Sequence, residues 1–230
     1  METRGRTGRL RTVGRHDLPA ACPVPGVIAL VGGGPFVAND DLDRRLLAAA
    51  GAARVVVLPT ADAFEEPAAL IRDALLWGER LGVLVEALMV LQRHEAEDEG
   101  AAGVVRGAQA VWLVGDSSMH LRSTLKETPV LAALDVVVAA GGVVAAVGPS
   151  AAALCDPMLD QRGGAFTLGL GLVRGVAVVP GVEEWSEERR HRTLTLANTP
   201  VVELPTGSAL LRDGSAWELI GEPVVHGELP

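Results

Sequence analysis

The sequence predicts an α/β fold in which a mainly parallel sheet carries helices on both faces. Three observations indicate this class. Short apolar segments rich in β-branched residues alternate with segments of helical periodicity. The apolar segments are hydrophobic throughout rather than at every second residue, which is typical of parallel strands buried on both faces. The chain has 230 residues, a length that suits one such domain.

The N-terminal half alternates strand and helix. Buried strands are expected at residues 26–31, 54–58, 83–88, 110–114 and 143–147. Helices are expected at residues 40–50 and 67–81, from the polar loop after 114 through 126, and at 129–140. Asn39 is a suitable N-cap, Pro67 stands at a helix start, and Gly141 follows a helix end. This order predicts strands joined by crossover helices.

The pattern changes after residue 160, where glycines punctuate short β-like segments. One helix is expected at 186–197, and strands are expected at 201–204, 208–212 and 216–220. We expect a β-rich C-terminal part that extends the same sheet. Residues 25–230 would then form a single α/β domain, preceded by a basic, disordered tail at residues 1–24.

The charge pattern narrows the function classes. The formal net charge is −9, and residues 1–24 hold five Arg against two acidic residues, which leaves −12 for the remainder. A nucleic-acid partner is not expected, because phosphate binding needs a basic face. No apolar run reaches transmembrane length, so no membrane partner is expected. The Arg-rich start is also compatible with an organellar transit peptide, but the two distant cysteines, Cys22 and Cys155, favour a reducing cytoplasm.

The segment from Val143 to Leu154 contains the most specific motif. An apolar strand runs into Gly148-Pro149-Ser150-Ala151-Ala152 and then into a small-residue stretch that can begin a helix. This is the setting of a nucleophile elbow, with Ser150 as the nucleophile and the Ala151 amide as an oxyanion donor. The alternative is a plain strand–turn–helix in which Ser150 is the N-cap.

A second motif follows the strand at 110–114. Gly115 and Asp116 stand between that strand and a helix. A glycine there lets the backbone approach a ligand closely, with its amide free to donate. The alternative is that Asp116 or Ser117 simply caps the helix.

Together these segments resemble the aspartyl dipeptidase (peptidase E)/cyanophycinase family of serine peptidases. The resemblance extends over residues 26–225. It includes the first strand with its glycine-rich end, residues 55–61, the Gly-Asp loop, the elbow, residues 168–172 and residues 207–210. It implies a class I glutamine-amidotransferase-like fold, a flavodoxin-like three-layer sandwich. It also implies a Ser-His-acid triad.

The sequence departs from that triad. Ser150 matches the family's nucleophile, but the histidine position falls on Gly181 and the cyanophycinase acid position falls on Thr206. The aspartyl dipeptidase branch takes its acid from soon after the nucleophile, where Asp156 and Asp160 lie. A Ser hydroxyl needs a base to become nucleophilic. We therefore expect a catalytically impaired, divergent homologue that binds a small acidic or peptide-like ligand or a protein partner.

Two alternatives remain from the sequence. An active serine hydrolase on acidic peptides would need a relocated base, for which His120 is the best candidate because it follows the Gly-Asp loop. A purely structural role would place the chain in an oligomer such as a homodimer. No cofactor or metal is expected, because Gly32-Gly33-Gly34-Pro35 does not continue as a dinucleotide motif and the Cys and His residues lack zinc-ligand spacing.

Overall fold

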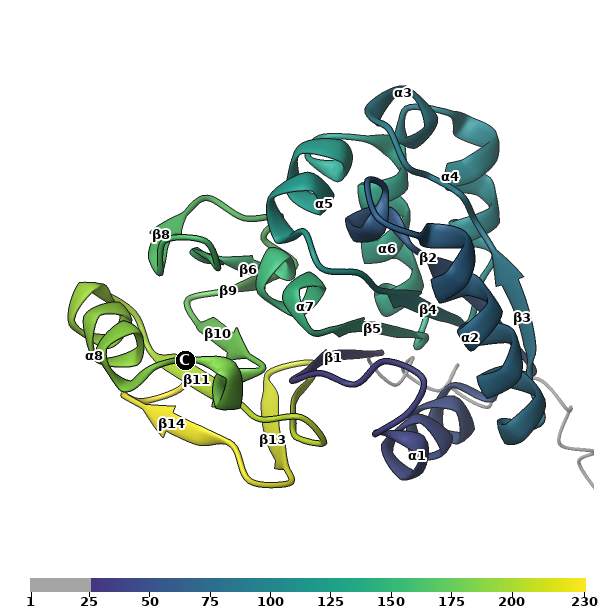
Figure 1. The fold of residues 1–230 in the computed structure, drawn as a ribbon. Helices are drawn as coiled ribbons and strands as arrows, with labels where there is room; N and C mark the ends of the chain where they lie inside the picture. The colour runs from purple at the N-terminus through teal and green to yellow at the C-terminus, as the bar shows by residue number, and fades with distance from the viewer. Residues whose placement is uncertain (1–25) are drawn as a thin grey trace, which may run out of the picture.

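The computed structural model describes residues 26–230, and a seven-stranded sheet forms its centre (Figure 1). In spatial order the strands are β13 (Ala216–Ile220), β12 (Ala209–Asp213), β1 (Val27–Val31), β5 (Val143–Val147), β4 (Ala110–Leu113), β2 (Arg54–Leu58) and β3 (Leu84–Ala87). The five strands from β1 to β3 pair in parallel, whereas β12 and β13 add to β1 in antiparallel pairs. The predicted α/β class is confirmed. The tail expected at residues 1–24 lies outside the described residues.

Helices cover both faces of this sheet (Figure 1). The first two, α1 (Asp40–Ala50) and α2 (Pro67–Leu81), pack on one face. The other face carries α3 (Arg93–Ala96), α4 (Glu99–Arg106), α5 (Ser118–Leu125), α6 (Pro129–Ala139) and α7 (Pro149–Leu154). A 3₁₀ turn, η1 (Thr60–Asp62), follows β2. Within residues 26–230 no helix combines the length and the apolarity needed to cross a membrane.

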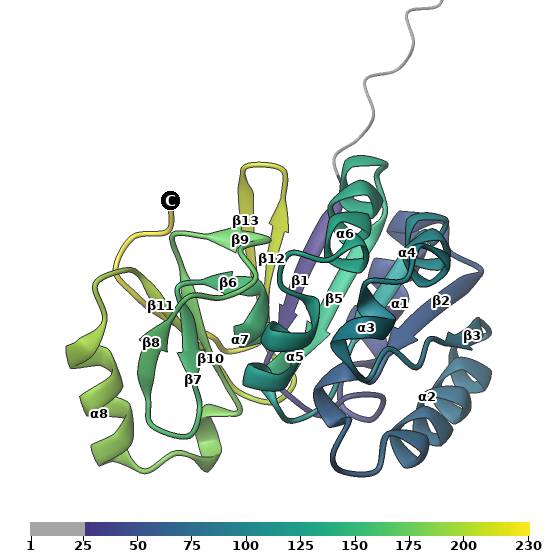
Figure 2. The ribbon, with the colours of Figure 1, turned by 90° about the horizontal axis from the view of Figure 1, so that it is seen from above.

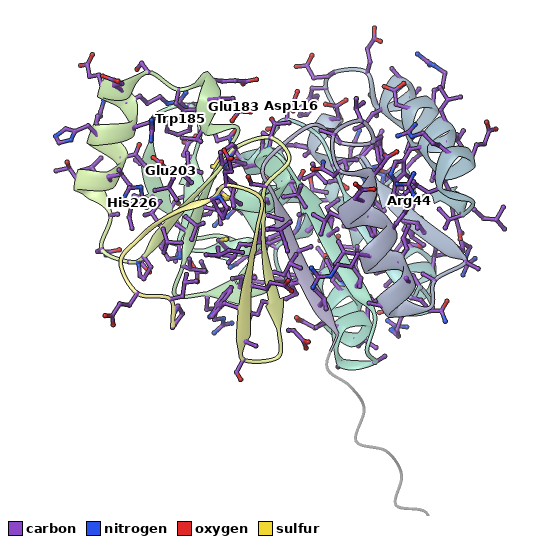
Figure 3. All side chains as sticks on the ribbon, turned by 90° about the horizontal axis from the view of Figure 1, so that it is seen from below. Arg44, Asp116, Glu183, Trp185, Glu203 and His226 are labelled. Carbon is purple, nitrogen blue, oxygen red and sulfur yellow. The ribbon has the colours of Figure 1, made fainter. Side chains whose placement is uncertain are left out.

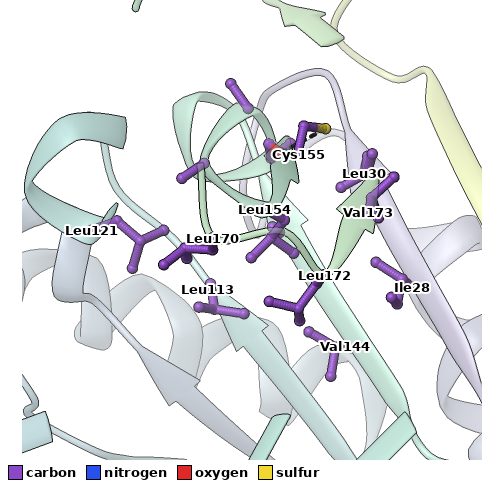
Figure 4. Packing of buried hydrophobic residues seen from close by; sticks show 14 of the residues in the cluster. Ile28, Leu30, Leu113, Leu121, Val144, Leu154, Cys155, Leu170, Leu172 and Val173 are labelled. Carbon is purple, nitrogen blue, oxygen red and sulfur yellow. Dashed lines mark hydrogen bonds between the residues drawn. The ribbon is translucent and has the colours of Figure 1, made fainter. Parts of the chain in front are cut away.

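Two hydrophobic cores explain why the strands are apolar at every residue. Successive side chains of a strand point to opposite faces. Ile28 and Leu30 of β1 belong to the core under α4–α7, part of which is shown in Figure 4, whereas Ala29 and Val31 belong to the core under α1 and α2. The other central strands divide in the same way.

The acidic stretch around residues 94–99 contains helices α3 and α4, which the sequence patterning did not predict. Their ends are capped by polar side chains: Gln92 and Glu95 form a capping box for α3, and Asp98 accepts from the Ala101 amide at 2.8 Å. Only small or branched residues such as Ala96 and Val105 are buried. Short helices with few apolar positions give little periodicity to detect.

The C-terminal part lies beside the β12–β13 end of the sheet (Figure 2). It contains β6 (Cys155–Asp156), β7 (Met158–Asp160), β8 (Ala165–Thr167), β9 (Val173–Arg174), β10 (Ala177–Pro180), the 3₁₀ turn η2 (Val182–Glu184), α8 (Glu187–Leu196), β11 (Val201–Leu204) and β14 (Val224–His226). Strands β10, β11 and β14 form a separate sheet.

The expectation that the whole C-terminal part extends the main sheet is therefore wrong for residues 201–204. Strand β11 pairs in parallel with β10 across the α8 crossover, and it pairs with β14 on its other side. The backbone N–H and C=O groups of β11 therefore form their hydrogen bonds within this second sheet. Only β12 and β13 join the main sheet.

Candidate functional site

A cleft of about 350 Å³ opens at the carboxyl ends of β1, β5 and β4. These strands are neighbours in the sheet, so the loops that follow them converge. The lining comprises Gly32, Gly33, Gly34, Pro35, Gly115, Asp116, Val147, Gly148, Pro149, Gln161, Pro180, Gly181, Glu184, Trp185 and Thr206. Figure 3 shows Asp116, Glu183 and Trp185 along this edge of the molecule. Ligands of open α/β sheets bind at this edge.

Gly148 occupies the sharp turn between β5 and α7. Its backbone has φ 62° and ψ −138°, a combination that only glycine adopts readily. This strained strand-to-helix turn is the position of the nucleophile in an elbow. Helix α7 begins at the next residue, Pro149. The chain thus turns sharply between β5 and α7, and the residue at the apex of this turn has no side chain.

Ser150 stands two residues beyond the apex and is fully buried. Its hydroxyl donates to the Gly115 carbonyl at 3.1 Å, and its side chain does not line the cleft. The expectation that this hydroxyl stands above the sheet edge is wrong. Ser150 instead ties the start of α7 to the loop after β4.

The oxyanion donors expected of an elbow are also altered. The donor is the amide of the residue after the apex, and that residue is Pro149, which has no N–H. The amide expected to serve, Ala151, donates instead to the Gly148 carbonyl at 2.8 Å. The turn therefore presents neither a hydroxyl nor the adjacent amide to the cleft.

Gly115 lines the cleft beside Asp116, where the sequence motif suggested a ligand-binding loop. Its φ is 116°, and a Cβ at this position would lie 2.5 Å from the Asp62 nitrogen. Glycine is thus required for the loops after β2 and β4 to approach each other. Burial and the neighbouring negative charge of Asp116 raise the pKa of the Asp62 carboxyl above its usual value.

Gly181 and Thr206, the two positions that the resemblance matched to a triad histidine and acid, both line the cleft. Gly181 is left-handed at the start of η2, with φ 62°, and Thr206 lies in the loop before β12. The Thr206 amide donates to Glu183 Oε1 at 3.0 Å. Burial opposes ionisation, yet the hydrogen bonds from Thr206 hold the pKa of Glu183 below its usual value. Glu183 therefore lies against the acid position as an ionised carboxylate.

His120 does not reach the elbow. Its Nε2 lies 2.8 Å from the Leu91 carbonyl oxygen and 3.2 Å from Thr124 Oγ1, and its ring packs against Phe64 with centroids 4.6 Å apart. The imidazole thus joins α5 to the loops before α2 and α3. In the described part of the chain no histidine lines the cleft, so the expected relocated base is not in place.

Several lining residues were missed by the sequence reading, among them Gln161, Glu184 and Trp185. Gln161 follows β7, Glu184 ends η2 and Trp185 comes directly after it, and no local motif marks these positions. The apex residue, in contrast, could have been predicted from the sequence. Proline favours the first position of a helix, so Pro149 predicts that α7 begins there and that Gly148 is the turn residue.

The charged lining is acidic. Asp116 and Glu184 are the charged residues of the cleft wall, and no Lys or Arg lines it. No group of three or more His, Cys, Asp or Glu side chains in residues 26–230 is arranged to hold a metal ion. The site is therefore a polar cleft with negative charge.

Comparison with solved structures relates the fold to that of peptidases. The chain is similar to a peptidase from an acI-B1 actinobacterium, with a TM-score of 0.78, 22% identity, and coverage of 89% of this chain and 91% of that one. It is also similar to a putative peptidase E protein from Listeria monocytogenes EGD-e, with a TM-score of 0.68, 17% identity, and coverage of 85% and 98%. The chain has the fold of these peptidases. No protein-family model matches it, and no curated protein matches its sequence.

Proposed function

We propose that this chain is a peptidase-like homologue of the aspartyl dipeptidases and cyanophycinases that is catalytically impaired and acts by binding a ligand or a peptide segment in its cleft. The peptidase fold and the cleft at the carboxyl ends of β1, β5 and β4 support the binding role. The observation that carries the impairment is the glycine at the elbow apex.

At each position where serine catalysis needs a particular chemical group, this chain has a residue that lacks that group. Gly148 supplies no hydroxyl, Pro149 no amide, Gly181 no imidazole and Thr206 no carboxylate. Removing the nucleophile or the base of a serine triad costs on the order of 10⁶ in kcat. Much of what remains in such variants comes from the oxyanion donors, and here one of those is missing as well. Peptide hydrolysis through a serine acyl-enzyme is not expected.

A fluorophosphonate probe tests the impairment, because it reacts with activated serines. We expect no adduct in the mass spectrum of the intact full-length chain, under conditions in which chymotrypsin is labelled completely. Ser150→Ala should give the same spectrum as the unmodified sequence, since Ser150 is buried. Stoichiometric labelling that Ser150→Ala abolishes would refute the impairment.

Gly148→Ser is the matched variant, because a Cβ at this position meets no atom within 4 Å. It returns a hydroxyl to the apex without supplying a base. We expect it to remain unlabelled, since an unactivated serine is a weak nucleophile. Rapid labelling of this variant would mean that another group acts as the base, and the general-base part of the proposal would be wrong.

A further inference from the structure

Strand β3 forms one edge of the seven-stranded sheet, on the opposite side of the molecule from the C-terminal part (Figure 2). Within residues 26–230 it pairs with β2 alone. The Leu84 amide donates to the Ala53 carbonyl at 3.0 Å, so Leu84 and every second residue after it face β2. The N–H and C=O groups of Val85 and Ala87 therefore face outward. In the described part of the chain no hydrogen bond reaches them.

The side chains of β3 do little to protect this open edge. Sheets often protect an edge with Lys or Pro, because unpaired backbone groups accept another strand. The sequence of β3, Leu84-Val85-Glu86-Ala87, contains neither. Leu84 is 72% exposed, and the one charged residue, Glu86, already pairs with Arg54 at 2.7 Å.

An exposed leucine flanks the edge on each face of the sheet. Gly78 of α2 packs against Val85, which places the helix face that carries Leu75, three residues earlier, beside β3. Leu75 is 47% exposed. Leu84 is next to Val85 in the strand, so it lies on the opposite face. The edge thus combines free backbone groups with apolar surface on both sides.

The same strand of a second copy fits this edge in antiparallel pairing, because a two-fold axis lets one patch complement itself. A pairing centred on Glu86 would place the two Glu86 carboxylates directly opposite each other, which is destabilising. A pairing centred on Val85 avoids this and places Leu84 opposite Glu86 of the second copy. The Val85 groups would then bond each other, and each Ala87 amide would reach the Val83 carbonyl across the axis.

Charge complementarity supports the pairing centred on Val85. Arg54 of β2 aligns with Leu84 of β3 in the sheet. Neighbouring strands lie about 4.8 Å apart. The Glu86 of the second copy, opposite Leu84, would therefore stand two strands from Arg54, within reach of two long side chains. Each guanidinium could then bind a carboxylate of both copies.

We propose that two copies of this chain associate through β3, in antiparallel pairing centred on Val85, and form one continuous sheet. This interaction surface is independent of the proposed binding function. Strand β2 separates β3 from β4, so the cleft at β1, β5 and β4 stays open in the dimer.

Light scattering after size-exclusion chromatography of the full-length chain tests the association. At about 100 µM we expect twice the mass of one chain, which is 23.9 kDa. The Val85 and Ala87 amides should also exchange hydrogen more slowly at about 100 µM than at about 1 µM. A mass of one chain at the higher concentration would overturn the proposal.

Leu84→Glu tests the register, because it sets a second carboxylate opposite Glu86 of the other copy at two symmetric places. We expect the dimer to dissociate about tenfold more readily or worse. The double variant Leu84→Glu, Glu86→Leu exchanges the two side chains and again places a leucine opposite a glutamate. It should restore the dimer.

Leu76→Glu is the matched control, since Leu76 is 60% exposed on α2 and lies on the side of Arg80, which binds Asp40 of α1. It should leave the dimer unchanged. Far-UV circular dichroism checks that each variant is folded. An unchanged dimer in Leu84→Glu, a double variant that stays dissociated, or an equal loss in Leu76→Glu would each overturn the proposal and leave the ligand-binding function untouched.

Discussion

Replacing Asp43 with Asn should make the free energy of unfolding less dependent on pH. Asp43 lies on α1 with 2% of its surface exposed, and it accepts a hydrogen bond from the Trp77 indole nitrogen at 3.0 Å. Burial raises the pKa of this carboxyl from 3.8 to about 7. The proton therefore binds more tightly in the folded chain than in the unfolded chain.

The sign and size follow from linkage. Between pH 3.8 and about 7 the unfolded chain loses this proton while the folded chain keeps it, so stability falls as pH rises. Each unit of difference between the folded and unfolded pKa changes the free energy of unfolding by ~1.4 kcal/mol. The difference of about three units therefore corresponds to about 4 kcal/mol. Above pH 7 this contribution is constant. Asn cannot ionise, and its side-chain oxygen can still accept from Trp77.

Urea unfolding followed by far-UV circular dichroism at pH 5 and pH 8 measures the effect. Relative to the original chain, Asp43→Asn should gain about 3 kcal/mol on going from pH 5 to pH 8, because about two pH units of that interval lie below the native pKa. Asp41→Asn is the control on the same helix, where the carboxylate is fully exposed. The reasoning would be refuted if the free energies of unfolding of Asp43→Asn and the original chain differed by the same amount at pH 5 and at pH 8.

Three further predictions concern buried polar contacts and the loops at the cleft. Ser150→Ala should cost ~1 kcal/mol in urea unfolding, because the Gly115 carbonyl loses its 3.1 Å donor. Gly115→Ala should lower the melting temperature and cost at least ~2 kcal/mol, since its Cβ would lie 2.5 Å from the Asp62 nitrogen. Glu203→Gln should cost about 2 kcal/mol at neutral pH, because the buried carboxylate loses its 2.6 Å ion pair with Arg190. Although burial opposes it, Arg190 holds the pKa of Glu203 below its usual value, so this cost should disappear in thermal melts as pH falls through that pKa.

The proposed loss of catalysis is compatible with the fold that this chain shares with the solved peptidases. The strand–turn–helix junction keeps its backbone, because the turn positions β5 and α7 in the core. The functional groups at that turn are separable from the fold. A glycine at the apex relieves the backbone strain that a serine would bear.

Much of the fold was readable from the sequence. The central strands are apolar at every residue because both of their faces are buried. The longer helices α1, α2 and α6 have helical periodicity and proline or glycine at their ends. Strand β11 could not be assigned to its sheet, because its pairing with β10 and β14 depends on where α8 takes the chain. Periodicity reports which residues are buried and does not report which strand is the neighbour.

By itself, the sequence determined that this chain is an α/β protein and marked the loop after β4 with a glycine; the absence of a histidine and a carboxylate at two triad positions stays a prediction. The tertiary structure decided which residue stands at the elbow apex. Ser150 and Gly148 are both compatible with the motif, and the choice rests on where β5 ends and α7 begins. Because one residue of helix rotates a side chain by about 100°, a shift of two positions turned the serine from the cleft into the core.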